Sequence, residues 1–336
     1  VVCACACCAF PAENRVRSEL DFAKKAINDG FYDLAENKLS TLLGSNMPKE
    51  IEGEVHLLLG RVYYEKALPA KALAEFNYVL ETFSENSLAS SAAFWTAEVY
   101  FKQANFKYAL EHYQYLIKSF PLSEYAPHSD YSQAWCYEKL GEYDLALDAF
   151  REVCSKYPDN ELAIKAKYKT AEILYSRGRY ADAVKELKEF IDKYPVNERI
   201  FDAYYMLGDC YYKSGDFSGA AAGFKSALQG GGGKRWRSRA AYKLGRSYFQ
   251  VGDMRRAEEF FTRACEESAE TSVKGSALIG LARVHMRKGE TDAAVKAYRR
   301  AIEDVPKNES TDDAYYWLAD TLCKSGRVTE AVDIFK

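Results

Sequence analysis

Small residues recur along this chain every 37 residues, and this spacing constrains the fold more than any other feature. One series consists of Ala or Gly and runs through Ala23, Gly60, Ala97, Ala134, Ala171, Gly208, Gly245, Ala282 and Ala319. A second series lies 12 residues further on and is Ala throughout: Ala35, Ala72, Ala109, Ala146, Ala183, Ala220, Ala257, Ala294 and Ala331. A fixed period of this length is typical of stacked structural units rather than of one compact core.

Two further series give each unit a helical pattern. Large apolar residues follow the second series by four positions, at Leu39, Phe76, Tyr113, Phe150, Leu187, Phe224, Phe261, Tyr298 and Phe335. Glycines recur in the middle of most units, at Gly30, Gly141, Gly178, Gly215, Gly252, Gly289 and Gly326. Because Gly adopts the left-handed conformation that ends a helix, we expect it to separate two helices per unit.

One unit shows this helix–turn–helix pattern in full. Residues 202–212 carry apolar side chains three and four positions apart, which is the spacing of one helix face. A polar turn follows at residues 213–216, and a second helix is predicted from Phe217 onward. A single pair of helices cannot bury its own apolar face, so neighbouring units must stack. The sequence therefore predicts an all-α fold.

The pattern resembles the tetratricopeptide repeat, whose consensus is W-x2-L-G-x2-Y, then A-x3-F, then P. The matching segments include Leu207-Gly208-x2-Tyr211 with Ala220-x3-Phe224, Leu59-Gly60-x2-Tyr63 and Leu244-Gly245-x2-Tyr248. The resemblance covers residues 16–336, but the period is 37 residues instead of 34, and the aromatic residue of the first helix is often displaced or absent. It implies an α-α superhelical solenoid of about nine helix–turn–helix units that binds a protein or peptide on its concave face.

The units at residues 134–158 and 171–195 both end in Lys-Tyr-Pro. In this respect they are similar to the repeats of bacterial envelope proteins, including the outer-membrane assembly lipoproteins and the cell-division coordinator of the Tol-Pal system. The likeness implies an exported bacterial adaptor in the periplasm or at the outer membrane. A cytoplasmic location is the alternative.

Residues 1–12 differ from the repeats because they are apolar, uncharged and rich in cysteine, with Cys3, Cys5, Cys7 and Cys8. Such a segment is typical of the end of a secretory signal, with cleavage after Ala9 or Ala12. Its order Val-Cys-Ala-Cys loosely resembles a lipobox, so lipidation of Cys3, Cys5 or Cys7 would anchor the chain to a membrane. A disordered terminus is the alternative.

The sequence contains no motif for catalysis or cofactor binding. The four histidines, His56, His112, His128 and His285, are isolated from one another, and the cysteines after residue 12 are scattered singly. Neither a phosphate-binding loop nor a nucleophile motif is present. We therefore predict a non-enzymatic protein with no catalytic residue, no metal and no cofactor.

The net charge argues against a general attraction to nucleic acid, because 46 Lys and Arg residues face 49 Asp and Glu residues, for a net charge of -3. Residues 234–239, Lys-Arg-Trp-Arg-Ser-Arg, are a local exception, with Trp236 available for base stacking. Nucleic-acid binding through this segment is one alternative function. An accessory or regulatory part of a larger enzyme is another.

The position within the repeat predicts which side chains line the inner surface. Three residues before the first small series lie Tyr131, Tyr168, Tyr205 and Tyr242. Their rings form either a stripe that binds an extended or helical peptide, or part of the packing between first helices with only the hydroxyl groups exposed. The sequence favours neither interpretation.

Basic residues gather on the predicted inner surface of the seventh and eighth units. Arg246 and Arg283 each follow the first small series by one residue, and Arg239, Lys243 and Arg287 lie nearby. Because Arg binds a carboxylate through two parallel hydrogen bonds, the expected ligand is an acidic segment or a peptide C-terminus. The alternative is a solvated basic face without a ligand.

Two irregularities interrupt the array. Four consecutive glycines at residues 230–233 replace the turn between the sixth and seventh units, and they form either a long helix cap or a hinge. The chain stops at Lys336, inside the last predicted helix. Because terminal repeats need a polar outer face, we expect that the natural protein continues or that a partner covers this end.

Overall fold

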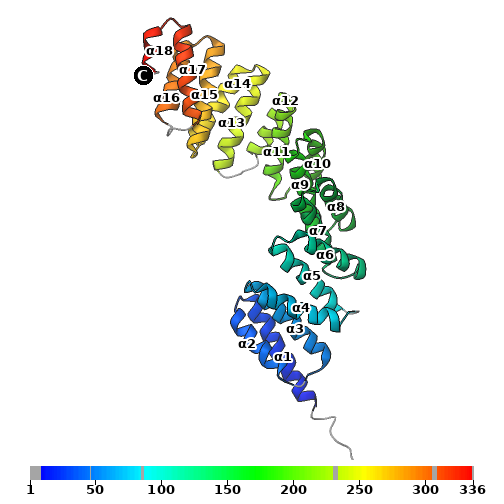
Figure 1. Ribbon diagram of the computed structural model, residues 1–336. Helices are drawn as coiled ribbons and strands as arrows, with labels where there is room; N and C mark the ends of the chain where they lie inside the picture. Colours follow the sequence, from blue (N-terminus) through cyan, green and yellow to red (C-terminus); the bar gives the residue numbers. More distant parts are fainter. Residues whose placement is uncertain (1–8, 46, 85–86, 230–233, 305–308, 335–336) are drawn as a thin grey trace, which may run out of the picture. The chain divides into compact units, whose positions relative to one another are not determined.

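The computed structural model describes residues 9–45, 47–84, 87–229, 234–304 and 309–334, and this part of the chain contains 18 helices and no strand (Figure 1). Residues 1–8 and 230–233, which include most of the predicted secretion signal and the predicted hinge, lie outside these ranges. In chain order the helices are α1 (Ala9–Asn28), α2 (Tyr32–Leu43), α3 (Lys49–Glu65), α4 (Pro69–Thr82), α5 (Ser87–Lys102), α6 (Phe106–Ser119), α7 (Ala126–Leu140), α8 (Tyr143–Lys156), α9 (Glu161–Ser176), α10 (Tyr180–Lys193), α11 (Ile200–Lys213), α12 (Phe217–Gln229), α13 (Lys234–Val251), α14 (Met254–Glu267), α15 (Thr271–Lys288), α16 (Thr291–Glu303), α17 (Glu309–Lys324) and α18 (Val328–Ile334).

The helices form nine consecutive pairs within the described ranges, which confirms the predicted all-α repeat fold. Two compact units, Val1–Ala166 and Lys167–Lys336, divide the chain inside α9. In the second unit, α11 packs on α12, α13 on α14 and α15 on α16 (Figure 1). First helices of neighbouring pairs are also in contact, as α13 is with α15 and α15 with α17. Each pair thus buries its apolar face against the next.

A left-handed residue ends the first helix of every pair. Seven of these residues are the glycines of the predicted series, with φ between 72° and 90°. At Gly141, its own N–H group and that of Glu142 donate to the carbonyl groups of Glu138 and Tyr137, at 3.0 and 2.9 Å. These bonds satisfy carbonyl groups that the end of the helix leaves free. After α3 and α5 the same position holds Ala67 and Ala104, with φ values of 55° and 57°.

The small and large series form the core of each pair. The second Ala series is buried from Ala35 to Ala331, with no member more than 1% exposed. The first series faces the large residues, because a Cβ atom added to Gly208 would lie 2.9 Å from the ring of Phe224. Where this series is Gly, the two helices of a pair therefore approach more closely than a side chain at that position would permit.

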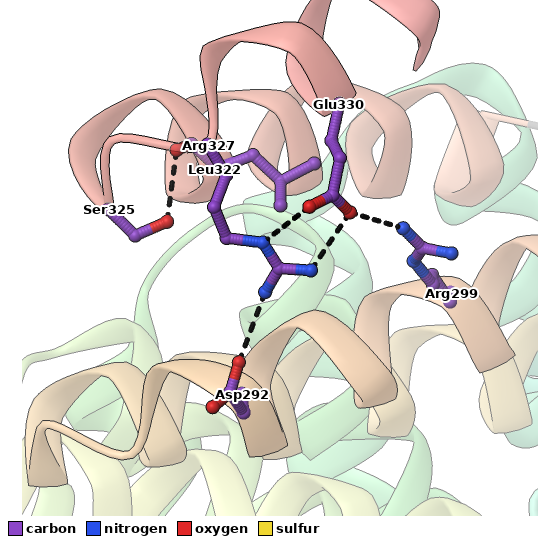
Figure 2. A network of polar contacts seen from close by, with 6 residues as sticks. All are labelled: Asp292, Arg299, Leu322, Ser325, Arg327 and Glu330. Carbon is purple, nitrogen blue, oxygen red and sulfur yellow. Dashed lines mark hydrogen bonds and ion pairs between the residues drawn. The ribbon is translucent and has the colours of Figure 1, made fainter.

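The last pair is joined to the preceding one by an arginine-centred network (Figure 2). Arg327, in the turn between α17 and α18, donates from Nε to Glu330 Oε1 at 2.7 Å and from Nη2 to Glu330 Oε2 at 2.8 Å. Its Nη1 donates to Asp292 Oδ1 on α16 at 3.0 Å, and Arg299 Nη2, also on α16, donates to Glu330 Oε2 at 3.1 Å. These forked bonds fix the start of α18 against α16.

Candidate functional site

The basic residues predicted for the seventh and eighth units lie on two first helices that contact each other. Arg246 is on α13, and both Arg283 and Arg287 are on α15. Arg246 and Arg283 occupy the same position in their repeats, one residue after a buried small residue, so they lie on the same side of their helices. We call Arg246, Arg283 and Arg287 the arginine cluster.

Two tyrosine rings support the guanidinium group of Arg246. Its Cζ atom lies 4.8 Å from the ring centroid of Tyr212 and 5.8 Å from that of Tyr242. A ring contacts the face of a guanidinium group and leaves its N–H edges free to donate. Arg246 is therefore held in place without using the donors that a ligand would need.

Arg283 and Arg287 share a second aromatic support. Their Cζ atoms lie 5.5 and 5.6 Å from the ring centroid of Phe249, and Arg283 also lies 5.9 Å from that of Trp317. In the part of the chain that the structure describes, no carboxylate forms an ion pair with any member of the arginine cluster. Three guanidinium groups on one surface consequently remain available to an anionic ligand.

A pocket of 230 Å³ lies between Arg246 on α13 and Arg283 on α15. It is lined by residues of α13, α14, α15 and α17: Tyr242, Arg246, Phe249, Gln250, Phe261, Ser276, Ile279, Gly280, Arg283 and Asp313. Drug-sized ligands occupy pockets of roughly 300–1,000 Å³, so this volume suits a single side chain or a chain end.

Lys243 lies on α13 beside the arginine cluster but already has a partner. Its Nζ atom donates to Asp209 Oδ1 on α11 at 2.6 Å, and the Tyr175 hydroxyl on α9 donates to the other oxygen of the same carboxylate. Asp209 is only 5% exposed. Burial opposes its ionisation, but the hydrogen bonds from Lys243 and Tyr175 outweigh burial and hold the pKa of Asp209 below its ordinary value. Lys243 thus compensates a buried charge within the protein.

Arg239, near the start of α13, is also paired. Its Nε and Nη2 atoms donate to Glu270 Oε2 at 3.0 and 2.9 Å. Trp236, in the segment considered for nucleic-acid binding, is 45% exposed and packs edge-to-face with Tyr205, with 5.9 Å between the ring centroids. The side chains of Lys234 and Arg235 lie outside the described part of the chain. Of the five cations predicted for this surface, the three of the arginine cluster have no carboxylate partner among the described residues.

The four predicted inner-surface tyrosines each pack against the ring of a phenylalanine from a second helix. The ring centroids are 5.5 Å apart for Tyr131 and Phe150, 5.4 Å for Tyr168 and Phe190, 5.3 Å for Tyr205 and Phe224, and 6.0 Å for Tyr242 and Phe261. Tyr168 is only 4% exposed, whereas the other three are partly buried. Burial raises the pKa of Tyr205 to about 12. Tyr131 belongs to the first unit, and Tyr242 is the member of this group that lines the pocket.

Four pocket residues were missed by reasoning from the sequence: Gln250, Ser276, Gly280 and Asp313. Gly280 could have been found, because it is the one glycine at a position where the sixth, seventh and ninth units place Met206, Lys243 and Trp317. Asp313 lies in the first turns of α17, and its approach to the pocket depends on how the eighth and ninth units stack. The repeat pattern does not specify that detail.

No three His, Cys, Asp or Glu side chains among the described residues are placed to hold a metal ion. Burial raises the pKa of the Cys136 and Cys210 thiols to about 12 and that of Cys265 to about 11. Such thiols stay protonated at neutral pH and are poor nucleophiles. Within the same ranges, none of the helices has the combination of length and hydropathy that spanning a bilayer requires.

Comparison with models of protein families shows which family the chain matches. Models described as tetratricopeptide repeat match residues 20–87, 57–127, 129–160, 168–235, 238–271 and 275–336. No curated protein sequence matches the chain.

Two solved structures share the fold at low sequence identity. The C-terminal part of a TPR repeat-containing protein from Cytophaga hutchinsonii is 14% identical, with a TM-score of 0.62, and the match covers 77% of this chain and 98% of that one. The apo form of RapI is 12% identical, with a TM-score of 0.56, over 95% of this chain and 96% of that one. At these identities the likeness concerns the fold alone.

Proposed function

The chain belongs to the tetratricopeptide repeat family, a family of protein-interaction scaffolds, and on that premise we propose that it is a non-enzymatic scaffold that binds a protein or peptide through the first helices of its second unit. The proposal rests chiefly on one observation. Arg246 and Arg283 line the same pocket, and each is supported by aromatic rings without a carboxylate partner among the described residues.

The chemistry of this surface calls for a carboxylate ligand. Two guanidinium groups from neighbouring helices converge on one small pocket, and a guanidinium fork matches the two oxygens of a carboxylate. The ligand is an acidic segment or the C-terminus of a partner, lying across α13 and α15 on what is the concave face in arrays of this kind. Arg287, with its Cζ atom 5.6 Å from the ring centroid of Phe249, adds charge at the edge of the same surface.

Reversing the charge of Arg246 and Arg283 tests the proposal. Because each charge-assisted hydrogen bond contributes ~1.5–3 kcal/mol, we expect Arg246→Glu with Arg283→Glu to weaken partner binding about 100-fold or more. The measurement is affinity purification from native cells with wild-type and variant chains as bait, followed by crosslink mapping onto α13 and α15. Partners bound by the wild-type chain should be missing from the variant.

The control is a second double reversal, Lys225→Glu with Arg255→Glu, on α12 and α14. Both residues are exposed, lie on second helices and do not line the pocket. This control produces the same change in net charge, so it should retain the partners. Equal loss in the two variants would mean that binding depends only on overall charge, and the proposed site would be wrong.

We propose further that the chain is exported to the periplasm or the outer membrane. The support is the apolar, cysteine-rich composition of residues 1–12. Cell fractionation and mass spectrometry of the natural protein test it. A shortened or lipidated N-terminus in the envelope fraction is expected, whereas an intact N-terminus in the cytosol would contradict export.

A further inference from the structure

A second pocket of the second unit lies between the second helices α14 and α16, which both pack on α15. Its volume is 440 Å³, and none of its lining residues lines the pocket beside the arginine cluster. We call it the second-helix groove. Its lining residues lie between Glu258 and Glu266 on α14, between Lys274 and His285 on α15, and between Ala293 and Arg300 on α16.

The corresponding positions of the preceding pair carry three large side chains that contact one another. Tyr248 on α13 stacks on Phe260 of α14, with 5.7 Å between the ring centroids. Arg256, also on α14, has its Cζ atom 4.8 Å from the ring centroid of Tyr248. The protein therefore fills this part of the seventh pair with its own side chains.

The eighth pair has smaller residues at the same three positions. The residues 37 positions further on are His285, Ala293 and Ala297, and all three line the groove. His285 stands where the repeat consensus has tyrosine. Below them, Leu278 and Leu281 of α15 line the same groove and are 1% and 9% exposed. The groove thus arises from three residue changes within the repeat and has an apolar floor.

The shape of the lining suits a helix. Along α15 the lining residues are Lys274, Leu278, Leu281 and His285, which are four, three and four residues apart and extend over about 16 Å of one helix face. Helices pack on one another through stripes with this spacing. An extended segment suits the floor less well, because its side chains alternate between opposite faces.

The two walls of the groove carry opposite charges. Glu258 and Glu266 lie about two turns apart on α14, and Lys296 and Arg300 lie about one turn apart on α16. Arg300 is exposed, and its Nη2 atom lies 3.8 Å from Asp304 Oδ2 at the end of α16. An occupant with basic residues toward α14 and acidic residues toward α16 would complement both walls.

One charge on each wall has no ion-pair partner. Glu258 already accepts a hydrogen bond from Lys288 Nζ at 2.8 Å. Within the described ranges neither Glu266 nor Lys296 forms an ion pair, and both side chains are exposed. These two groups remain available to an occupant of the groove.

We infer that the second-helix groove binds an amphipathic helix of a partner protein. The apolar stripe of that helix packs on Leu278 and Leu281, its basic flank faces α14, and its acidic flank faces α16. The site goes beyond the proposed function, because it is a second interaction surface on the second helices and shares no lining residue with the pocket of the arginine cluster.

The test uses labelled helical peptides of about 15 residues, which is long enough to span the groove. All have the same apolar stripe of Leu, and a hydrocarbon crosslink on the opposite face keeps them helical. The first has Lys on one flank and Glu on the other, the second has Lys on both flanks, and the third has Glu on both. Fluorescence anisotropy measures binding to the full chain. We expect the mixed-charge peptide to bind about 10-fold more tightly than either of the others.

A fourth peptide tests the need for a helix. It has the composition of the mixed-charge peptide except for two central prolines, which break the helix, and it lacks the crosslink. We expect no measurable binding. Binding as tight as that of the helical peptide would contradict a helical occupant.

Filling the groove should remove the site. His285→Tyr with Ala297→Phe gives the eighth pair the residues that the seventh carries as Tyr248 and Phe260, and should weaken binding of the mixed-charge peptide about 100-fold or more. Because the seventh pair accommodates these side chains, the variant should keep its helices, as circular dichroism shows. Ala74→Phe, at an exposed position of α4, is the control and should leave binding unchanged.

Reversing one wall tests the charges without adding bulk. Lys296→Glu with Arg300→Glu makes both walls acidic, so the peptide with Lys on both flanks should become the preferred one. The control is Lys185→Glu with Lys225→Glu, at exposed positions of α10 and α12 outside the groove. It produces the same change in net charge and should retain the preference for the mixed-charge peptide.

The outcomes separate this inference from the proposed function. Equal binding of the three helical peptides, or binding that survives the filled groove, would overturn the inference and leave the arginine cluster untouched. Loss of the mixed-charge peptide in Arg246→Glu with Arg283→Glu would show that it binds at the arginine cluster instead. Unchanged peptide binding in that variant, together with loss of its natural partners, would support both sites.

Discussion

At the scale of single residues, Ala67 and Ala104 adopt a backbone conformation that the other seven pairs assign to glycine. Their φ values of 55° and 57° lie in the left-handed region, where Cβ crowds the carbonyl oxygen at a cost of ~1–2 kcal/mol. Gly avoids this strain but loses more entropy on folding. We expect Ala67→Gly and Ala104→Gly each to raise the free energy of unfolding by ~0.5–1 kcal/mol, measured by urea denaturation.

The matched control for Ala67→Gly is Ala74→Gly, an exposed position in the middle of α4. Because Gly in a helix interior is less favourable than Ala, this change should lower the free energy of unfolding by ~0.5–1 kcal/mol. A similar loss at both positions would show that the left-handed conformation of Ala67 carries no strain.

The sequence predicted the residue-scale features that repeat and missed those that do not. Seven turns were marked by glycine, but nothing in the pattern marks Ala67 or Ala104 as left-handed, because Ala is ordinarily helical. The pairing of Lys243 with Asp209 joins residues 34 positions apart on different first helices. A long flexible lysine can reach several carboxylates, so spacing alone does not choose among them.

At the scale of the helix pair, the 37-residue period was enough to predict the main features. Because every member of the second Ala series is buried, the spacing identified the seam between the two helices of each pair. The predicted start of the second helix at Phe217 is confirmed by α12. The pocket was harder to predict, since its lining comes from four helices of three successive pairs.

Overpacking the seam should destabilise a pair. Ala220 is fully buried in α12, and Ala220→Val adds two methyl groups where helices already touch. We expect a loss of ~1–3 kcal/mol in the free energy of unfolding, measured by thermal denaturation. Ala222→Val, at an exposed position of the same helix, is the control and should cost at most ~0.7 kcal/mol from helix propensity. Equal effects would contradict the tight seam.

At the scale of the whole chain, stability is distributed over neighbouring pairs. Each pair in the second unit contacts its neighbours in sequence, so a local loss of stability should spread only through adjacent interfaces. We expect Ala220→Val to speed hydrogen exchange in α11, α12 and α13 and to leave the exchange of α1 to α4 unchanged, as followed by mass spectrometry. Uniform acceleration along the chain would show that the array unfolds as one cooperative block.

The carboxylate of Asp209 gives the second unit a mechanical property. It accepts hydrogen bonds from Tyr175 on α9 and Lys243 on α13, so one buried charge on α11 connects three successive first helices. Pulling these helices apart would leave a buried ionised group without its donors, which is costly. These bonds therefore resist extension of the array at α9, α11 and α13. They hold the spacing between the three first helices on which a bound chain would lie.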